Sequence, residues 1–304
     1  LSFPALAEAV QSFAGTLHIS GLSRGERVAV YLEKRLETVI ALFGASAAGG
    51  AFVPVNPLLK AEQVVYILND CNVRILITSA DRLNLLSSVL SQCHDLHTVI
   101  TVDEAREMPS IPGLNTVSWQ QAQTPSSETV HLPRCIDSDM AAILYTSGST
   151  GKPKGVVLSH RNLVTGAKSV SQYLNNQASD RILAVLPLSF DYGLNQLNTA
   201  FYVGATAVLM NYLLPRDILS IIQREQITGL AAVPPLWTQL AQLNRQDIST
   251  LRYITNSGGA MPRTTLAHLR KALPDTEIFL MYGLTEAFRS TYLPPAEVDI
   301  RPDS

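Results

Sequence analysis

The chain has 304 residues, of which 46% are hydrophobic and 16% are charged, and its formal net charge is −2. This composition excludes a disordered chain and supplies enough apolar side chains for about two compact domains. The slightly acidic balance lacks a basic stripe, which argues against a nucleic-acid-binding protein, so we expect small-molecule partners.

The cysteines and the longest apolar segment bear on the cellular compartment. Three unevenly spaced cysteines predict neither a disulfide framework nor a zinc site, and we expect a reducing, cytoplasmic location; they are Cys71, Cys93 and Cys135. The apolar run 39–55 is interrupted by two adjacent glycines and a proline, so it predicts a buried helix, turn and strand and no membrane span. No signal peptide precedes it, although a chain that starts without Met can be an excised fragment.

The first third of the chain alternates between helix and strand patterns. Apolar residues recur at spacings of three and four over 3–17, which predicts an amphipathic helix. Strand-like segments then alternate with helix-like ones, the strands at 27–32, 51–55, 73–78 and 98–102 and the helices at 36–48, 61–68 and 81–90. This rhythm predicts an α/β fold with a mostly parallel, helix-covered sheet, so we assign 1–102 to a first subdomain.

The remaining chain predicts a connection and a second sheet. The proline-rich segment 103–138 has little periodicity and is expected to be a surface connection. In the second subdomain, 139–304, strand patterns recur at 182–186, 205–210, 229–232, 251–255 and 278–281, with helix patterns at 161–173, 194–202, 215–225, 236–243 and 263–273. Ligands bind at the carboxyl ends of such strands, where the loops 187–193, 256–262 and 282–286 are unusual.

A polar loop between two apolar, strand-like segments predicts a phosphate-binding element, called here the phosphate loop (residues 146–155). Its glycines permit close backbone approach, its hydroxyls can donate, and its two lysines add positive charge, as a polyphosphate requires. These residues are Thr146, Ser147, Gly148, Ser149, Thr150, Gly151, Lys152, Lys154 and Gly155. The nucleoside triphosphatase P-loop pattern fails, because Thr146 replaces its first glycine and Pro153 follows the lysine. A flexible linker explains the composition but not the flanking strands.

Two later loops suggest further ligand contacts. The pair Gly258 and Gly259 would let the backbone lie flat against a planar ligand, while the alternative is a tight strand-to-helix turn. Thr285 and Glu286 suit Mg²⁺ with phosphate oxygens, while the alternative for Glu286 is an acidic residue at a helix start.

Other candidate residues concern the acid substrate. Phe190, Trp237 and Ser257 are candidate substrate-binding residues, and generic core packing is an equal alternative for Trp237. No Ser-His-Asp arrangement supports His160 as a base, so we expect it near a helix start, with Ser159 as the helix cap.

The motifs TSGSTGKPKG, followed by VVLSH, and MYGLTEA resemble those of the AMP-forming ligases, which include acyl-CoA synthetases, luciferases and the adenylation domains of peptide synthetases. The whole string is most similar to acyl-CoA ligases associated with exosortase loci. The resemblance implies an adenylate-forming N-terminal domain with two helix-covered sheets. It implies a small carboxylic acid and ATP as substrates and Mg²⁺ as cofactor, with CoA or a carrier-protein phosphopantetheine as acyl acceptor.

The resemblance also assigns roles to individual residues. Gly258, Gly259 and Tyr282 would sandwich adenine, with Gly283 beside them. Thr285 would contact the α-phosphate and Glu286 the metal, and Lys154 would act with them in catalysis. Phe190-Asp191 matches a pair in amino-acid-activating relatives, where the aspartate binds the substrate ammonium; the alternative is that Asp191 caps a helix.

The chain departs from the family by ending at Ser304, without a Tyr-x-Thr-Gly-Asp segment or the smaller C-terminal domain with its catalytic lysine. We therefore expect the larger part of an N-terminal domain, catalytically incomplete as it stands. Two other functions stay open, a non-catalytic nucleotide-binding module and a kinase-like phosphotransferase that releases ADP.

Overall fold

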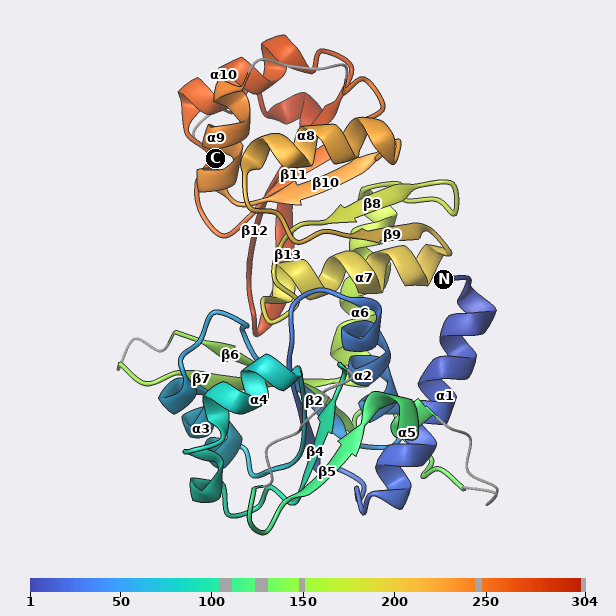
Figure 1. The fold of residues 1–304 in the computed structure, drawn as a ribbon. Coiled ribbons are helices and arrows are strands. Elements are labelled where there is room, and N and C mark those ends of the chain that lie inside the picture. The colour runs from blue at the N-terminus through green and yellow to red at the C-terminus, as the bar shows by residue number, and fades with distance from the viewer. Residues whose placement is uncertain (104–110, 124–130, 148–150, 244–247, 302–304) are drawn as a thin grey trace. The chain divides into compact units, whose positions relative to one another are not determined.

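Two sheets organise the chain, each in its own unit, Leu1–Asn162 and Leu163–Ser304 (Figure 1). The computed structural model describes residues 1–103, 111–123, 131–147, 151–243 and 248–301. Among them, no helix combines the length and the hydrophobicity that crossing a bilayer requires.

The first unit contains a seven-stranded sheet in the order β5-β4-β3-β1-β2-β6-β7, parallel except for the β6–β7 pair. Its strands are β1 (Arg27–Tyr31), β2 (Ala51–Pro54), β3 (Val73–Thr78), β4 (Thr98–Thr101), β5 (Asn115–Ser118), β6 (Met140–Thr146) and β7 (Lys154–Ser159). Its helices are α1 (Phe3–Ile19), α2 (Leu36–Ala47), α3 (Ala61–Asp70), α4 (Ala80–Leu86) and α5 (Trp119–Gln123), with a 3₁₀ turn, η1 (Leu90–Gln92). The central strands are buried because helices cover the sheet, as their continuous apolar sequences predict.

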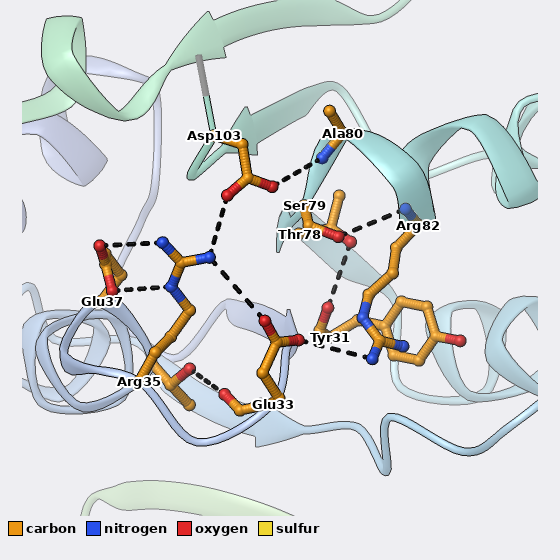
Figure 2. Close-up of polar contacts among 10 residues, drawn as sticks. Tyr31, Glu33, Arg35, Glu37, Thr78, Ser79, Ala80, Arg82 and Asp103 are labelled. Atoms are coloured by element: carbon orange, nitrogen blue, oxygen red, sulfur yellow. Dashed lines mark hydrogen bonds and ion pairs between the residues drawn. The ribbon is translucent and has the colours of Figure 1, made fainter. Parts of the chain in front are cut away.

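A charged network lies at the edge of this sheet formed by the carboxyl ends of the interior strands β1, β3 and β4 (Figure 2). The Arg35 guanidinium donates to both carboxylate oxygens of Glu37 at 2.8 and 3.1 Å and to Asp103 at 2.9 Å. Arg82 donates to Glu33 at 3.5 Å, and its guanidinium lies 4.7 Å from the Tyr31 ring centroid. Each arginine already has carboxylate partners, so this network stabilises the edge and offers a ligand little unpaired charge.

The second unit contains a six-stranded sheet in the order β13-β12-β11-β10-β8-β9, parallel except for the β12–β13 pair. Its strands are β8 (Arg181–Ala184), β9 (Thr206–Leu209), β10 (Gly229–Ala232), β11 (Tyr253–Asn256), β12 (Glu277–Leu284) and β13 (Ala287–Leu293). Its helices are α7 (Asp191–Val203), α8 (Pro215–Arg224), α9 (Pro234–Gln242) and α10 (Arg263–Ala272), with a 3₁₀ turn, η2 (Pro295–Glu297). Helix α6 (His160–Tyr173) begins in the first unit and continues into the second.

Alternating residues of the second sheet bury both of its faces. Ile254 and Ile278 belong to the core cluster formed with α8, α9 and α10. Their neighbours Tyr253 and Phe279 pack against Val170 of α6 on the other face. The helix-covered sheets confirm the predicted fold class.

The structure corrects the predicted organisation of the chain at two points. The strands β6 and β7 pair into the first sheet, through Phe52 and Ala142, so the phosphate loop belongs to Leu1–Asn162 and not to the predicted subdomain 139–304. The predicted connection 103–138 also contributes β5 and α5 to the first unit. Chain order and hydrophobic periodicity indicate strands but do not encode which sheet a strand joins, which explains both differences.

Candidate functional site

The phosphate loop lies at the tip of the β6–β7 hairpin. The two strands pair antiparallel up to Thr146 and Lys154, which confirms the prediction that strands hold the loop on both sides. Gly148, Ser149 and Thr150 lie outside the described residues. The loop therefore starts and ends at fixed, paired positions.

The described part of the loop presents positive charge to solvent. Ser147, Gly151, Lys152 and Lys154 are all exposed. Gly151 has φ +92°, a left-handed conformation that favours glycine. The Lys152 ammonium lies 5.8 Å from the Tyr66 ring centroid, and in the described part of the chain neither lysine forms an ion pair with a carboxylate. Both ammonium groups are thus available to a polyphosphate.

Packing explains another residue of the loop. Gly155 lies opposite Tyr145, and a Cβ there would stand 2.7 Å from Cγ2 of Ile143. The Tyr66 hydroxyl donates to the Pro153 carbonyl at 3.1 Å, which anchors the hairpin to α3. Close packing thus requires Gly155, whereas backbone conformation requires Gly151.

In the second unit, one cavity collects the residues that the sequence assigned to the planar ligand. Gly258, Gly259, Tyr282 and Gly283 all line a cavity of about 940 Å³. Gly258 has φ +78°, and the Tyr282 side chain is exposed beside it. Ser257, predicted as a substrate contact, is 4% exposed and does not line this cavity. The size suits a small-molecule ligand.

Asn256 is a cavity residue that sequence reasoning missed. Its Nδ2 donates to the Gly259 carbonyl at 3.0 Å, whereas its Oδ1 is buried without a hydrogen-bond partner. This oxygen is thus a buried acceptor without a partner in a residue that lines the cavity. A polar residue at the end of a buried strand was the available sequence signal.

Thr285 and Glu286 form the turn between β12 and β13. Thr285 is 8% exposed, and its hydroxyl donates to Oδ1 of Asp191 at 3.4 Å. Glu286 is exposed. The turn joins two strands, so Glu286 does not lie at a helix start, which was the predicted alternative. No cluster of three metal-ligating side chains occurs in the described ranges. Mg²⁺ often binds one or two carboxylates plus phosphate oxygens and waters, so a single exposed carboxylate fits this ion.

Asp191 is the first residue of α7 and is only 7% exposed. The N-cap position is Phe190, which makes no side-chain cap hydrogen bond, so the predicted alternative that Asp191 is the cap is wrong. The Phe190 ring packs edge-on against Tyr192. Burial raises the pKa of the Asp191 carboxyl, although the Tyr192 N–H, the Arg289 charge and the Thr285 hydroxyl act to lower it.

Trp237 lies in the core of the second unit. Its side chain is 2% exposed, and its indole N–H donates to the carbonyls of Ala232 and Thr255 at 3.1 and 3.2 Å. Trp237 does not line the described cavity of about 940 Å³, so the structure favours core packing over the predicted acyl-pocket wall. A buried tryptophan needs a partner for its N–H, which these carbonyls supply.

Ser159 caps helix α6 as predicted. Its hydroxyl accepts from the Asn162 N–H at 3.2 Å, and the Asn162 side chain accepts from the Ser159 N–H at 2.9 Å. His160 begins the helix, in agreement with its predicted place near a helix start. This reciprocal capping fixes how the chain leaves β7.

Comparisons with known proteins identify relatives of this chain. A family model described as AMP-binding enzyme matches residues 1–303. The chain is 31% identical over 285 residues to 4-coumarate–CoA ligase 3 of Arabidopsis thaliana, covering 90% of this chain and 49% of the relative. It is 31% identical over 301 residues to L-proline–[L-prolyl-carrier protein] ligase of Streptomyces coelicolor, covering 96% and 56%.

A solved structure of the anthranilate CoA ligase AuaEII in complex with anthranoyl-AMP has a TM-score of 0.85 and 26% identity, covering 92% of this chain and 54% of that one. The chain thus spans about half the length of these proteins. The narrower resemblance to exosortase-associated ligases stays a prediction. The match over nearly the whole chain shows that it belongs to the family of AMP-binding enzymes.

Proposed function

We propose that the protein containing this chain activates a small carboxylic acid with ATP and passes the acyl group to a thiol. The observation that carries this proposal is the cavity that brings Gly258, Gly259 and Tyr282 together within the unit that also holds Thr285 and Glu286. Adenine is planar, so it would fit between the two glycines and the tyrosine ring. The family match and the phosphate loop support the same assignment.

The chemistry requires positioned positive charge more than a protein nucleophile. A carboxylate oxygen attacks the α-phosphorus of ATP; the new O–P bond forms as the bond to the bridging oxygen of pyrophosphate breaks. Both reactants are anions, so Lys152, Lys154 and the loop donors would hold the β- and γ-phosphates and offset the repulsion. The thiolate then attacks the acyl carbon, and AMP leaves.

The hydroxyl of Thr285 and the carboxylate of Glu286 would act at the α-phosphate and at the metal ion. The Thr285 hydroxyl now donates to Asp191, and it would donate to the α-phosphate instead when ATP binds. Glu286 would hold Mg²⁺. When bound, Mg²⁺ neutralises phosphate charge. Lys154 acts with them by contributing positive charge from the phosphate loop.

The acceptor in this proposal is CoA or the phosphopantetheine of an acyl or peptidyl carrier protein. The Arabidopsis relative is named as a CoA ligase and the Streptomyces relative as a carrier-protein ligase, which supports both acceptors. A cytoplasmic location is part of the proposal. All three cysteines are free, and burial raises the pKa of the Cys71 and Cys93 thiols to about 11, so both are unreactive thiols.

Product analysis of the full-length protein tests the reaction type. ATP is incubated with a panel of carboxylic acids, with CoA or a carrier protein, and the nucleotide products are separated. Acid-dependent release of AMP and pyrophosphate is expected. Release of ADP would indicate a phosphotransferase, and ATP binding without acid-dependent turnover would indicate a non-catalytic module.

A further inference from the structure

Arg289 is a buried cation whose hydrogen bonds the fold leaves incomplete. The residue is 4% exposed, and its Nη2 donates to Oδ1 of Asn195. Its Nε and Nη1 are buried and have no hydrogen-bond partner. Across the described ranges, no carboxylate oxygen lies within ion-pair distance of this guanidinium. The face of Tyr192, 5.1 Å from the guanidinium carbon, supplies part of its environment.

Such an arrangement is unfavourable for a chain that needs only to fold. A guanidinium stays charged in proteins, and a buried charge without a full set of partners is costly. The arginines at the edge of the first sheet, Arg35 and Arg82, have carboxylate partners instead. Arg289 therefore calls for a partner that the described part of the chain does not provide.

A β-bulge directs Arg289 into the unit. The β12–β13 register passes from the Leu284–Ala287 pair to the Tyr282–Thr291 pair, so the bulged segment of β13 is longer than its partner. Arg289 lies within the bulge with φ +37°, a conformation that non-glycine residues adopt rarely. Gly283 permits the bulge, because a Cβ there would stand 2.3 Å from the Arg289 nitrogen. Backbone strain of this kind often marks a functional position.

A third open donor lies beside the guanidinium. The Oδ1 of Asn195 accepts from Thr199 at 2.6 Å as well as from Arg289, which fixes the amide orientation. Its Nδ2 therefore points elsewhere, and this atom too is buried without a partner. Gly166 of α6 lies on that side, where a Cβ would come within 3.3 Å of Nδ2. Two guanidinium nitrogens and one amide nitrogen thus lack acceptors in one buried region.

Asp191 does not fill this need. Its carboxylate interacts with the Arg289 charge from beyond ion-pair distance and accepts from Thr285 and the Tyr192 N–H. Burial raises the pKa of this carboxyl. An additional anion with several oxygens would match the three open donors.

We propose that Arg289 and Asn195 bind a second carboxylate group of the acid substrate, one that does not react; this inference rests on the proposed function. The substrate is then a dicarboxylic acid or an acid with an equivalent anionic group. The carboxylate that attacks ATP is a poor candidate for this site, because a guanidinium that holds both of its oxygens lowers its nucleophilicity. Arg289 belongs to β13, whose residues Thr291 and Tyr292 line the cavity of about 940 Å³, whereas Arg289 and Asn195 do not line it.

The first test compares matched acids in ATP–pyrophosphate exchange by the full-length protein. Each dicarboxylic acid is paired with a monoacid of equal length, such as succinate with butanoate and glutarate with pentanoate. The parent is expected to prefer the diacids. Arg289→Met should lower kcat/KM for the diacid about 100-fold and leave the monoacid within about threefold, because only the diacid loses a charge-paired contact. Arg289→Lys should restore part of the preference.

A matched control separates this effect from a general loss of arginine. Arg224→Met removes an exposed guanidinium on α8 and should leave the ratio of diacid to monoacid unchanged. An unchanged ratio in Arg289→Met would overturn the anion site while leaving the proposed function intact. Absence of exchange with every acid would contradict the proposed function instead.

Thermal unfolding gives a second readout that does not depend on turnover. Without ligand, Arg289→Met should unfold at the parental temperature or above it, since it removes a buried, incompletely paired charge. Succinate or glutarate should raise the unfolding temperature of the parent but not that of the variant. A strongly destabilised variant, together with equal shifts by diacids and monoacids in the parent, would show that Arg289 is structural and overturn the proposal.

Discussion

Two carboxylate residues of the second unit, Glu286 in the β12–β13 turn and Asp191 at the start of α7, differ in their exposure to solvent. Glu286 is exposed, and among the described residues it has no hydrogen bond or ion pair, so it is free to bind a cation. Asp191 is buried, receives the Thr285 hydroxyl and interacts with the Arg289 charge. In the proposed function, Glu286 would hold the metal and Asp191 would position Thr285.

Substituting Glu286 by Gln keeps the size and removes the charge. In the full-length protein, the Mg²⁺ concentration that gives half-maximal exchange should rise, because a carboxylate is a stronger ligand for this ion than an amide. The unfolding temperature should barely move for so exposed a residue. Glu277→Gln, at the exposed start of the same strand, is the control. A Mg²⁺ titration that matches the parent's would remove Glu286 from the metal site.

Substituting Asp191 by Asn removes the negative charge that interacts with Arg289. We expect the free energy of unfolding to stay at the parental value or above it, because burial raises the pKa of this carboxyl and so disfavours its charged form in the fold. Urea denaturation measures this free energy, with the exposed Asp275→Asn as control. Exchange should then fall equally for amino acids and for their des-amino analogues. A loss of exchange confined to amino acids would instead make Asp191 an ammonium-binding residue.

Single-residue patterns predicted part of this site and missed the rest. Gly258, Gly259 and Tyr282 were identifiable because glycine pairs and a motif tyrosine stand out in the sequence, and the structure places them on one cavity. Arg289 was missed, since one arginine in a strand-like segment ordinarily reads as an exposed charge. Only the bulge turns it inward, and no hydrophobic period encodes a bulge.

At the scale of elements, the β12–β13 hairpin is the part of the second unit that positions most of the candidate residues. Its turn carries Thr285 and Glu286, its first strand carries Tyr282, and its bulge carries Arg289. The sequence predicted a strand only over 278–281, whereas β12 continues to Leu284 and β13 returns beside it. The glycine within the motif and the polar residues after it obscured the strand pattern.

Gly283→Ala tests whether the bulge holds this hairpin together. The added Cβ would meet backbone nitrogen of Arg289 at 2.3 Å, and backbone cannot move aside as a flexible side chain can. We expect a loss of about 1–3 kcal/mol in unfolding free energy and a larger proportional loss of exchange activity, since Thr285 and Arg289 would both shift. Parental stability and activity would show that the hairpin tolerates another geometry.

At the scale of the whole molecule, the alternation of helices and strands predicted the two sheets, and most elements lie within a few residues of their predicted ranges. The division into units was not predictable, because β6 and β7 leave the chain order and join the first sheet. The phosphate loop therefore belongs to the first unit and the cavity to the second.

The most direct test of the proposed function is carboxylate-dependent ATP–pyrophosphate exchange by the full-length protein and its Lys152→Ala, Lys154→Ala double variant. Each lysine supplies a charge-assisted donor worth about 1.5–3 kcal/mol, so the double variant should lose at least about 100-fold in exchange rate. Lys168→Ala, which removes an exposed lysine of α6, should exchange at the parental rate. Parental exchange by the double variant, or exchange by the parent that does not depend on a carboxylic acid, would contradict the account.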